Sequence, residues 1–309
     1  MKRFCYILLA TLLVASCGPG RFDPLKVDLD RALKHPLSAR EIYSDADVIP
    51  LQGPEGMAIG QETMLLDVTP DRFVLLDAGK NEILLFDGGG RFVTAIGRAE
   101  TILDGSVYRD QVLEVLTQDA FFDYALTDGS LLAAHPFDNG GVALKSLARV
   151  DEDSIFMLGS KDGYAYGCGY IMGVNRFYSS ACYYSDYLTT HAYAPASEIQ
   201  NSRYFRCGET VYSFLSQCGE IDQYTGSDFV CAPYEWDFGK RQPCFTNAQK
   251  TADRLYLAFD LDGESAVLVY DLTNHRYKAV PQSEFPLGII RNGCNYAFAH
   301  GAITRYALR

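Results

Sequence analysis

Histidines and paired cysteines, from which many metal centres are built, are scarce in this sequence. The 309 residues include five histidines, whose scattered positions match no metal-ligand spacing. No Cys-x-x-Cys pair occurs, and no cysteine and histidine cluster has the spacing of a zinc site. A structural metal centre is therefore not expected.

Positive charge is also scarce. Lysine and arginine number 27 against 39 aspartates and glutamates, which gives a formal net charge of −12. The longest basic run is Lys240-Arg241. Binding to a phosphate backbone needs a basic face. We therefore expect no nucleic acid among the partners.

Recognisable catalytic motifs are missing as well. No nucleophile-elbow motif supports a hydrolytic triad, and Gly88–Gly90 lacks the Lys-Ser/Thr of a phosphate-binding loop. Two acidic groups, Asp151–Asp153 and Asp260-x-Asp262, offer the oxygen atoms that calcium prefers. Neither completes a twelve-residue calcium loop, so we expect both to be turns. No cofactor is expected, and calcium is left as an alternative.

Long hydrophobic runs are absent except at the start of the chain. Lys2 and Arg3 precede an apolar run over residues 4–14, which is too short to span a bilayer. Small residues then stand directly before Cys17, a pattern typical of a lipoprotein signal. We expect residues 1–16 to be removed and Cys17 to be acylated. The alternative is ordinary secretion, with Cys17 merely near the cleavage point.

The expected mature chain has 293 residues, since 16 of 309 are removed, and loses two positive charges, from −12 to −14. Residues 17–40 are interpreted as a tether, with one short helix over residues 28–34. Gly18 is not the aspartate that retains lipoproteins in the inner membrane, and residues 18–22 lack an acidic surface-display signal. We expect an outer-membrane anchor with the protein facing the periplasm.

Seven cysteines remain after Cys5 and Cys17 are set aside. Export permits disulfides, but an odd number cannot all pair within one chain. Cys207 and Cys218 flank an expected strand over residues 209–216, which separates them too widely to bond to each other. The pairing is left open, and we expect at least three to be small buried side chains. The seven are Cys168, Cys182, Cys207, Cys218, Cys231, Cys244 and Cys294.

From residue 41 onward the pattern is typical of an all-β protein. Tyrosine (21) and phenylalanine (18) are abundant, and aromatic residues suit half-buried sheet surfaces. Short apolar runs alternate with Asp-Gly and Asn-Gly pairs, which accept the positive φ of hairpin turns. These pairs begin at Asp87, Asp104, Asp128, Asn139, Asp162, Asp262 and Asn292.

The apolar runs also repeat along the chain. Residues 71–87 and 253–271 both read as strand, turn, strand, and each leads into a further strand. Similar strand cores recur about every 45 residues, the length of a four-stranded propeller blade. We therefore predict a six-bladed β-propeller over residues 41–309, closed by residues 48–51 joining the last blade. The alternative is a β-sandwich with a second small β domain. The six cores begin near Phe73, Phe121, Ile155, Val211, Leu255 and Tyr296.

These segments resemble a known group, the six-bladed β-propeller lipoproteins of Bacteroides and relatives. The resemblance implies the propeller fold and an envelope location, and it implies no settled activity. In this sequence Arg98–Thr101 follows the first blade, where the group usually has a glycine-rich run. The residues that carry the resemblance are 47–51, 71–77, 83–87, 91–97, 201–205 and 235–239.

The candidate ligand site is an aromatic cluster in the third blade. Tyrosines there alternate with glycines, and tyrosine rings stack on sugars or hold peptides. The alternative is that these rings pack between blades. We expect a binding or scaffold module for a peptide, glycan or protein partner. A calcium-assisted hydrolase or lactonase at the channel, or a subunit of an envelope complex, is the alternative. The candidate residues of this cluster are Tyr164, Tyr166, Tyr170, Tyr183 and Tyr184. Trp236, the only tryptophan, is a separate candidate as a stacking platform, with packing in the core as its alternative.

Overall fold

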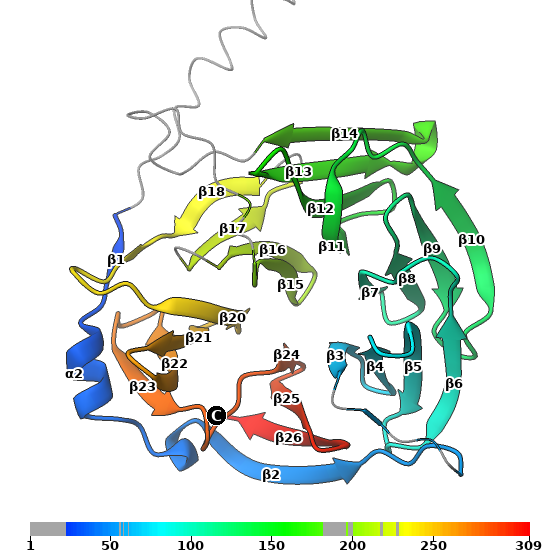
Figure 1. The fold of residues 1–309 in the computed structure, drawn as a ribbon. Helices are drawn as coiled ribbons and strands as arrows, with labels where there is room; N and C mark the ends of the chain where they lie inside the picture. Colours follow the sequence, from blue (N-terminus) through cyan, green and yellow to red (C-terminus); the bar gives the residue numbers. More distant parts are fainter. Residues whose placement is uncertain are drawn as a thin grey trace, which may run out of the picture.

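Six four-stranded antiparallel sheets stand like blades around a central axis (Figure 1). The structure is a computed structural model that describes residues 23–309 except 56, 58, 61, 182–195, 197–199, 217–218 and 227–228. The predicted six-bladed propeller is confirmed. No helix within the described residues is long and apolar enough to cross a membrane.

The first three blades take their strands in chain order from the axis outward. Blade 1 contains β3 (Thr63–Val68), β4 (Arg72–Asp77), β5 (Glu82–Asp87) and β6 (Phe92–Gly97). Blade 2 contains β7 (Asp104–Tyr108), β8 (Val112–Leu116), β9 (Ala120–Ala125) and β10 (Leu131–Pro136). Blade 3 contains β11 (Ala143–Arg149), β12 (Ser154–Lys161), β13 (Tyr164–Ile171) and β14 (Arg176–Ala181).

The last three blades complete the ring. Blade 4 contains β15 (Arg203–Cys207), β16 (Thr210–Leu215), β17 (Glu220–Tyr224) and β18 (Phe229–Tyr234). Blade 5 contains β20 (Cys244–Lys250), β21 (Arg254–Leu261), β22 (Glu264–Asp271) and β23 (Tyr277–Pro281). Blade 6 contains β24 (Ile289–Arg291), β25 (Cys294–Ala299), β26 (Ala302–Leu308) and, from the start of the chain, β2 (Tyr43–Pro50).

The ring closes through strands that are far apart in the sequence. β2 precedes blade 1 in the chain but pairs antiparallel with β26, so that Val48 faces Thr304 and Ile49 faces Ile303. The outermost strand of the last blade therefore comes from the segment that the sequence analysis assigned to it. Pairing the two ends in one sheet covers an edge of β26 that would otherwise be exposed.

One of the six predicted strand cores occupies a different position in its blade from the other five. Phe121 lies in β9, the third strand of blade 2, whereas the five other predicted cores begin the second strand of their blades. The true second strand is β8, whose short apolar run is interrupted by the fully buried Glu114. The aromatic run Ala120–Ala125 resembled the repeat more closely because its apolar pattern is stronger.

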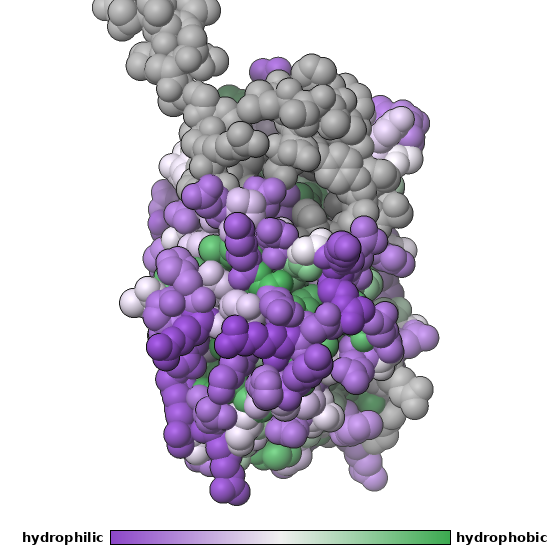
Figure 2. Space-filling view, turned by 90° about the vertical axis from the view of Figure 1, so that its left-hand side faces the viewer, coloured by the Kyte–Doolittle hydropathy of each residue, from purple (hydrophilic) through white to green (hydrophobic). Residues whose placement is uncertain are grey.

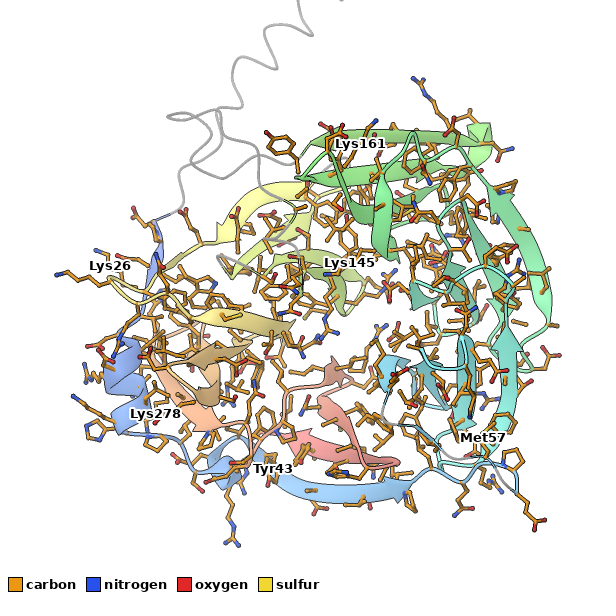
Figure 3. All side chains as sticks on the ribbon, in the orientation of Figure 1. Lys26, Tyr43, Met57, Lys145, Lys161 and Lys278 are labelled. Atoms are coloured by element: carbon orange, nitrogen blue, oxygen red, sulfur yellow. The ribbon has the colours of Figure 1, made fainter. Side chains whose placement is uncertain are left out.

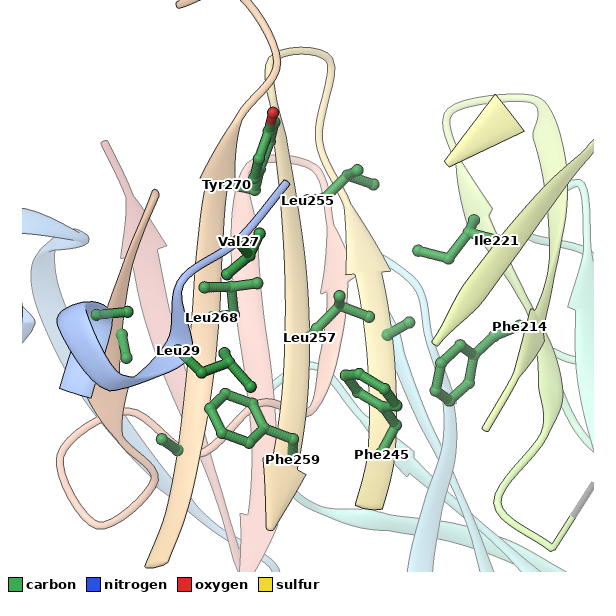
Figure 4. Close-up of a cluster of buried hydrophobic side chains, with 14 of the residues drawn as sticks. Val27, Leu29, Phe214, Ile221, Phe245, Leu255, Leu257, Phe259, Leu268 and Tyr270 are labelled. Carbon is green, nitrogen blue, oxygen red and sulfur yellow. The ribbon is translucent and has the colours of Figure 1, made fainter. Parts of the chain in front are cut away.

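The segment predicted as a tether is, from Leu25 on, part of the propeller. β1 (Leu25–Lys26) pairs in parallel with β19 (Trp236–Asp237), and it is followed by α2 (Leu29–Lys34) and a 3-10 turn over Ala39–Glu41. Figure 4 shows Leu29 beside Phe259 of blade 5, and Leu29 is only 1% exposed. The tether interpretation is wrong here because the apolar side chains of this segment cover the outside of blade 5. We call residues 25–42 the N-terminal strap.

The strap begins its helix where the sequence predicts it. The Asp28 carboxylate accepts a hydrogen bond from the Arg31 backbone N–H at 3.0 Å, which caps the first turn of α2. Arg241 then donates to Asp30 on the strap and to Asp262 in blade 5. Figure 2 shows a largely hydrophilic surface on the side of the molecule that carries α2.

Apolar layers between neighbouring blades form the core. Leu257 and Phe259 of blade 5 belong to one such layer with Phe214 and Ile221 of blade 4 (Figure 4). Burying each of these side chains contributes about 1.5–3 kcal/mol. The surface facing the axis is mixed, with apolar side chains such as Leu65 and Leu147 beside the charged residues of the inner strands.

Candidate functional site

The propeller axis contains two cavities that adjoin each other. One has a volume of about 340 Å³ and is lined by residues of the inner strands of all six blades. The other, of about 730 Å³, opens among the hairpin turns that follow the inner strands. Arg206 and Arg291 line both cavities. We call the 340 Å³ space the inner cavity and the other the outer cavity.

Charged side chains converge on the inner cavity. Its wall includes four cationic and two anionic residues, although the whole chain carries a formal net charge of −12. Figure 3 shows Lys145 near the central opening, whereas Lys26, Lys161 and Lys278 lie at the periphery. The six charged residues are Asp67, Asp104, Lys145, Arg203, Arg206 and Arg291.

Asp67 is held by neighbours from three blades. Its carboxylate accepts the backbone N–H of Val68 and that of Val107 in blade 2, both at 2.8 Å. Arg291 of blade 6 donates to it at 3.2 Å. The charge of Asp67 is therefore already balanced by Arg291, and its oxygen atoms are committed to the wall.

Asp104 starts β7 and faces the same cavity. Its carboxylate accepts the backbone N–H of Leu147 in blade 3 at 3.0 Å. Burial raises the pKa of Asp104 to about 7, against the opposing effect of the Arg203 charge. Burial therefore favours the neutral form of this carboxyl group far more than in a free aspartate, which is ionised at neutral pH.

Arg203 and Arg206 lie on the inner strand β15 and bond to neutral acceptors. Arg203 donates to the Asn247 side-chain oxygen, and Arg206 donates to the Arg149 carbonyl. In the described part of the chain neither guanidinium forms an ion pair, and both Nε atoms are buried without a hydrogen-bond partner. Burial lowers the pKa of both residues. The charge of each is thus incompletely compensated by the described protein groups.

A second buried charged cluster lies between blades 2 and 3, behind the channel wall. Arg149 contacts Glu114 at 3.2 Å and Asp123 at 3.7 Å, and His135 lies 3.3 Å from Asp123. Burial, assisted by the charge of Asp123, raises the pKa of Glu114 to about 8 despite Arg149. Arg149 also stacks on Tyr108, 4.6 Å from the ring centre. This cluster joins two blades and lines neither cavity.

The structure separates the predicted tyrosines. Tyr164 is 45% exposed, Tyr166 is half-buried, and Tyr170 is only 1% exposed. The Tyr170 ring packs 5.2 Å from Phe121 and 5.8 Å from Phe137, which is the alternative of packing between blades. Tyr183 and Tyr184 lie outside the described residues. None of the three described tyrosines lines the inner or outer cavity.

Trp236 is engaged at the outside of blade 5. Its indole N–H donates to the Gly219 carbonyl at 2.8 Å, and its ring stacks on Phe238 at 5.8 Å. The Trp236 ring therefore packs on the buried apolar cluster of blades 4 and 5. Trp236 lines neither the inner nor the outer cavity. Ligand binding by the aromatic residues stays a prediction.

Of the acidic groups considered for calcium, Asp151–Asp153 and Asp262 lie between strands, whereas Asp260 lies in β21 and is paired on both sides. The Asp151 carboxylate accepts the Asp153 backbone N–H at 2.9 Å, and Asp262 pairs with Arg241 at 2.8 Å. Over the residues that the structure describes, no three His, Cys, Asp or Glu side chains come together as a metal site. Calcium binding was a prediction from residue type alone and stays one.

The described cysteines differ in exposure. Cys168 is buried, Cys207 and Cys294 are half-buried, and Cys244 is exposed. Cys207, Cys244 and Cys294 stand at the ends of their strands, whereas Cys168 lies within β13. The expectation that at least three of the seven are buried stays a prediction, because burial is described for four of them. Cys17, Cys182 and Cys218 lie outside the described residues, and nothing is described of the Cys231 side chain.

Sequence reasoning missed the charged wall of the channel. A usable signal was present in Arg203-x-x-Arg206, two arginines on one strand in a chain with few basic residues. Asp67 lies within the inner strand β3, and Asp104 is the first residue of the inner strand β7. Each follows a leucine and occupies a position where an apolar residue would be usual. Their convergence depends on the radial arrangement of blades, which no local pattern displays.

Comparison with known proteins supports the fold. The sequence matches no protein-family model and no curated protein. A Bacteroides fragilis protein described as exported has a similar structure, with a TM-score of 0.65, 12% identity, and coverage of 93% of this chain and 98% of that one. A DUF4221 member from Bacteroides vulgatus aligns with a TM-score of 0.58, 7% identity, and coverage of 88% and 99%. Virginiamycin B lyase from Staphylococcus aureus aligns at 0.52, with 9% identity and coverage of 86% and 99%. At these identities the similarity concerns the fold.

Proposed function

We propose that this protein is an exported, membrane-anchored binding module whose ligand site is the central channel. The observation that carries the proposal is the inner cavity of about 340 Å³, to which all six blades contribute. Small-molecule sites are concave, largely preformed and fitted with a few convergent polar groups. Inner strands of a closed ring supply such groups on rigid elements.

The anchor in this proposal is an acyl chain on Cys17, in the outer membrane with the propeller facing the periplasm. The sequence pattern before Cys17 supports this part. The strap from Leu25 onward packs on blade 5, which leaves at most a short linker between Cys17 and the domain. The ligand would be a peptide, a glycan or a small part of a partner protein that enters the channel.

The hydrolase or lactonase alternative needs several oxygen ligands on one cation. Asp67 is instead bonded to two backbone N–H groups and Arg291, and Asp104 is bonded to the Leu147 backbone N–H. Guanidinium groups stand beside both in the cavity wall. The geometry therefore favours binding over metal-assisted hydrolysis.

A cavity-filling substitution tests the proposal. The mature chain, purified in detergent, is screened on glycan and peptide arrays beside the Ser106→Trp variant, which places a large ring in the inner cavity. Ser130→Trp, at an exposed turn of blade 2, is the matched control. We expect binding to be lost in Ser106→Trp and kept in Ser130→Trp. Ligands that bind all three proteins equally would contradict a channel site.

A further inference from the structure

We propose that the ligand of the channel is a small organic anion, whose carboxylate or phosphate group is bound by Arg203 and Arg206 in the inner cavity. This inference rests on the proposed binding function and specifies its chemistry. Arginine presents a planar fork of donors that matches the two oxygen atoms of a carboxylate or phosphate.

The first support is a set of donors that the described protein groups leave unsatisfied. The Nε atoms of Arg203 and Arg206 and the hydroxyl of Ser146 are buried without a hydrogen-bond partner among the described residues. All three residues line the inner cavity. Arginine can only donate, so these atoms require an acceptor. Because leaving a buried charged donor unsatisfied is costly, an anion in the cavity would stabilise the wall.

The second support is the balance of charge around the cavity. Of the two carboxylates in the wall, Asp67 is paired with Arg291 at 3.2 Å, and Asp104 interacts with the charges of Lys145 and Arg203. Arg206 interacts instead with the charges of Asp67, Glu114 and Glu209. Burial favours the neutral form of Asp104 at neutral pH. The wall is therefore positive inside a protein whose net charge is −12. A local positive field in a cleft raises the concentration of small anions there.

The third support is the arrangement of the cations around the cavity. Arg203 and Arg206 come from blade 4, and Lys145 comes from the inner strand of blade 3 beside it. Arg203 bonds to Asn247 of blade 5 and Arg206 to the Arg149 carbonyl of blade 3, so the two guanidinium groups reach the cavity from opposite faces of β15. Since Arg206 also lines the outer cavity, an anion bound to it sits where the two cavities adjoin.

The size of the cavity limits the ligand. A volume of about 340 Å³ lies near the lower end of small-molecule sites, which span about 300–1,000 Å³. A single acidic sugar or a short acidic molecule fits this volume, whereas a polymer would enter only by one end. The negative charge of the whole protein opposes large polyanions.

The inference is tested by calorimetric titration of the mature chain with four probes. These are D-galacturonate, galactose 6-phosphate, inorganic phosphate and the neutral sugar D-galactose. We expect at least one of the first two to bind and D-galactose not to bind. Inorganic phosphate binding as tightly as galactose 6-phosphate would assign the site to the free anion rather than to the organic molecule and would overturn the inference.

Substitutions then locate the site. Arg203→Gln and Arg206→Gln should each weaken anion binding about tenfold or more, because each removes a charge-assisted hydrogen bond. Arg276→Gln, at an exposed turn of blade 5, is the matched control and should bind as the parent does. Equal affinity in all these variants would overturn the inference, provided that circular dichroism shows each of them folded.

A variant with the opposite expected sign guards against misfolding of the arginine variants. Asp104→Asn removes the negative charge from the cavity while keeping the shape of the side chain. At pH 8 it should bind the anion several-fold more tightly than the parent, and its affinity should depend less on pH between 6 and 8. The parent could instead bind a neutral sugar or peptide and no anion, with that binding abolished in Ser106→Trp. This result would refute the inference of an anionic ligand and would leave the proposed binding function standing.

Discussion

Arg291 of the last blade donates a hydrogen bond to Asp67 of the first blade at 3.2 Å, across the point where the ring closes. Asp67 also accepts the backbone N–H of Val107 in blade 2 at 2.8 Å. One largely buried carboxylate therefore connects three consecutive blades at the axis. The closure of this propeller depends on polar contacts at its centre as well as on the β2–β26 pairing at its rim.

Removing this carboxylate should destabilise the protein strongly. Asp67→Ala leaves the guanidinium of Arg291 buried without its partner and leaves the Val107 N–H without an acceptor. Breaking a buried ion pair from one side costs about 3–5 kcal/mol. We expect a loss of this size in the free energy of unfolding, measured by urea denaturation.

An exposed ion pair at the same closure provides the control. Arg305 of β26 and Asp47 of β2 lie 3.1 Å apart, but their side chains are about half exposed. Because exposed ion pairs contribute about 0–1 kcal/mol, Asp47→Ala should lower the free energy of unfolding by no more than about 1 kcal/mol. Equal losses in Asp47→Ala and Asp67→Ala would show that the central pair has no special role in closure.

The fold could be predicted because its signals are local and repeated. Strands such as β5, with the buried run Ile83–Phe86, are covered on both faces by neighbouring blades and so read as short apolar runs. Hairpin turns such as Asp262-Gly263, where both residues have positive φ, mark the strand ends. The same local reasoning did not identify β8 as a strand core, because Glu114 interrupts its apolar run and the compensating Arg149 comes from another blade.

The channel could not be predicted in the same way. Asp67 and Arg291 are separated by 224 residues, and nothing in either local sequence indicates that they meet. The tyrosine-rich segment was conspicuous in composition, yet Tyr170 serves the packing of blade 3 against Phe121. Unusual composition identified a region of the core, whereas the charged wall arises from six residues on five separate strands.

The N-terminal strap should behave as part of the fold rather than as a linker. Leu29→Ala removes a side chain that is 1% exposed against Phe259 of blade 5, and such substitutions cost about 2–5 kcal/mol. We expect this loss in thermal or urea unfolding. Lys34→Ala, at an exposed position of the same helix, should have almost no effect. A neutral Leu29→Ala variant would restore the tether interpretation.

The predicted lipid anchor has a direct chemical test. Cells that express the chain are grown with an alkyne-tagged fatty acid, and the purified protein is assayed for the tag. We expect labelling of the parent and of Cys244→Ser, which alters an exposed cysteine, and no labelling of Cys17→Ser. Labelling that persists in Cys17→Ser would place the acyl chain elsewhere, and an unlabelled parent would indicate ordinary secretion.

Glu114 should make the stability of the protein fall as pH rises. Its pKa is about 8 in the folded protein, where burial raises it, and close to 4.5 in the unfolded chain. Between these values the unfolded chain has released a proton that the folded protein retains, so each rise in pH favours unfolding. The loss is complete only above about pH 8, once the folded protein has released its proton as well.

Glu114→Gln isolates this contribution, because glutamine keeps an acceptor for Arg149 and does not titrate. The variant should gain on the parent by about 4 kcal/mol in the free energy of unfolding as pH rises from 5 to 8.5, since each unit of pKa difference corresponds to about 1.4 kcal/mol. Urea denaturation at several pH values measures the difference, with the exposed Glu264→Gln as the matched control. A constant difference across this range would mean that Glu114 is ionised in the folded protein at neutral pH. The cluster between blades 2 and 3 would then hold an ionised Glu114 beside Arg149 rather than a protonated one.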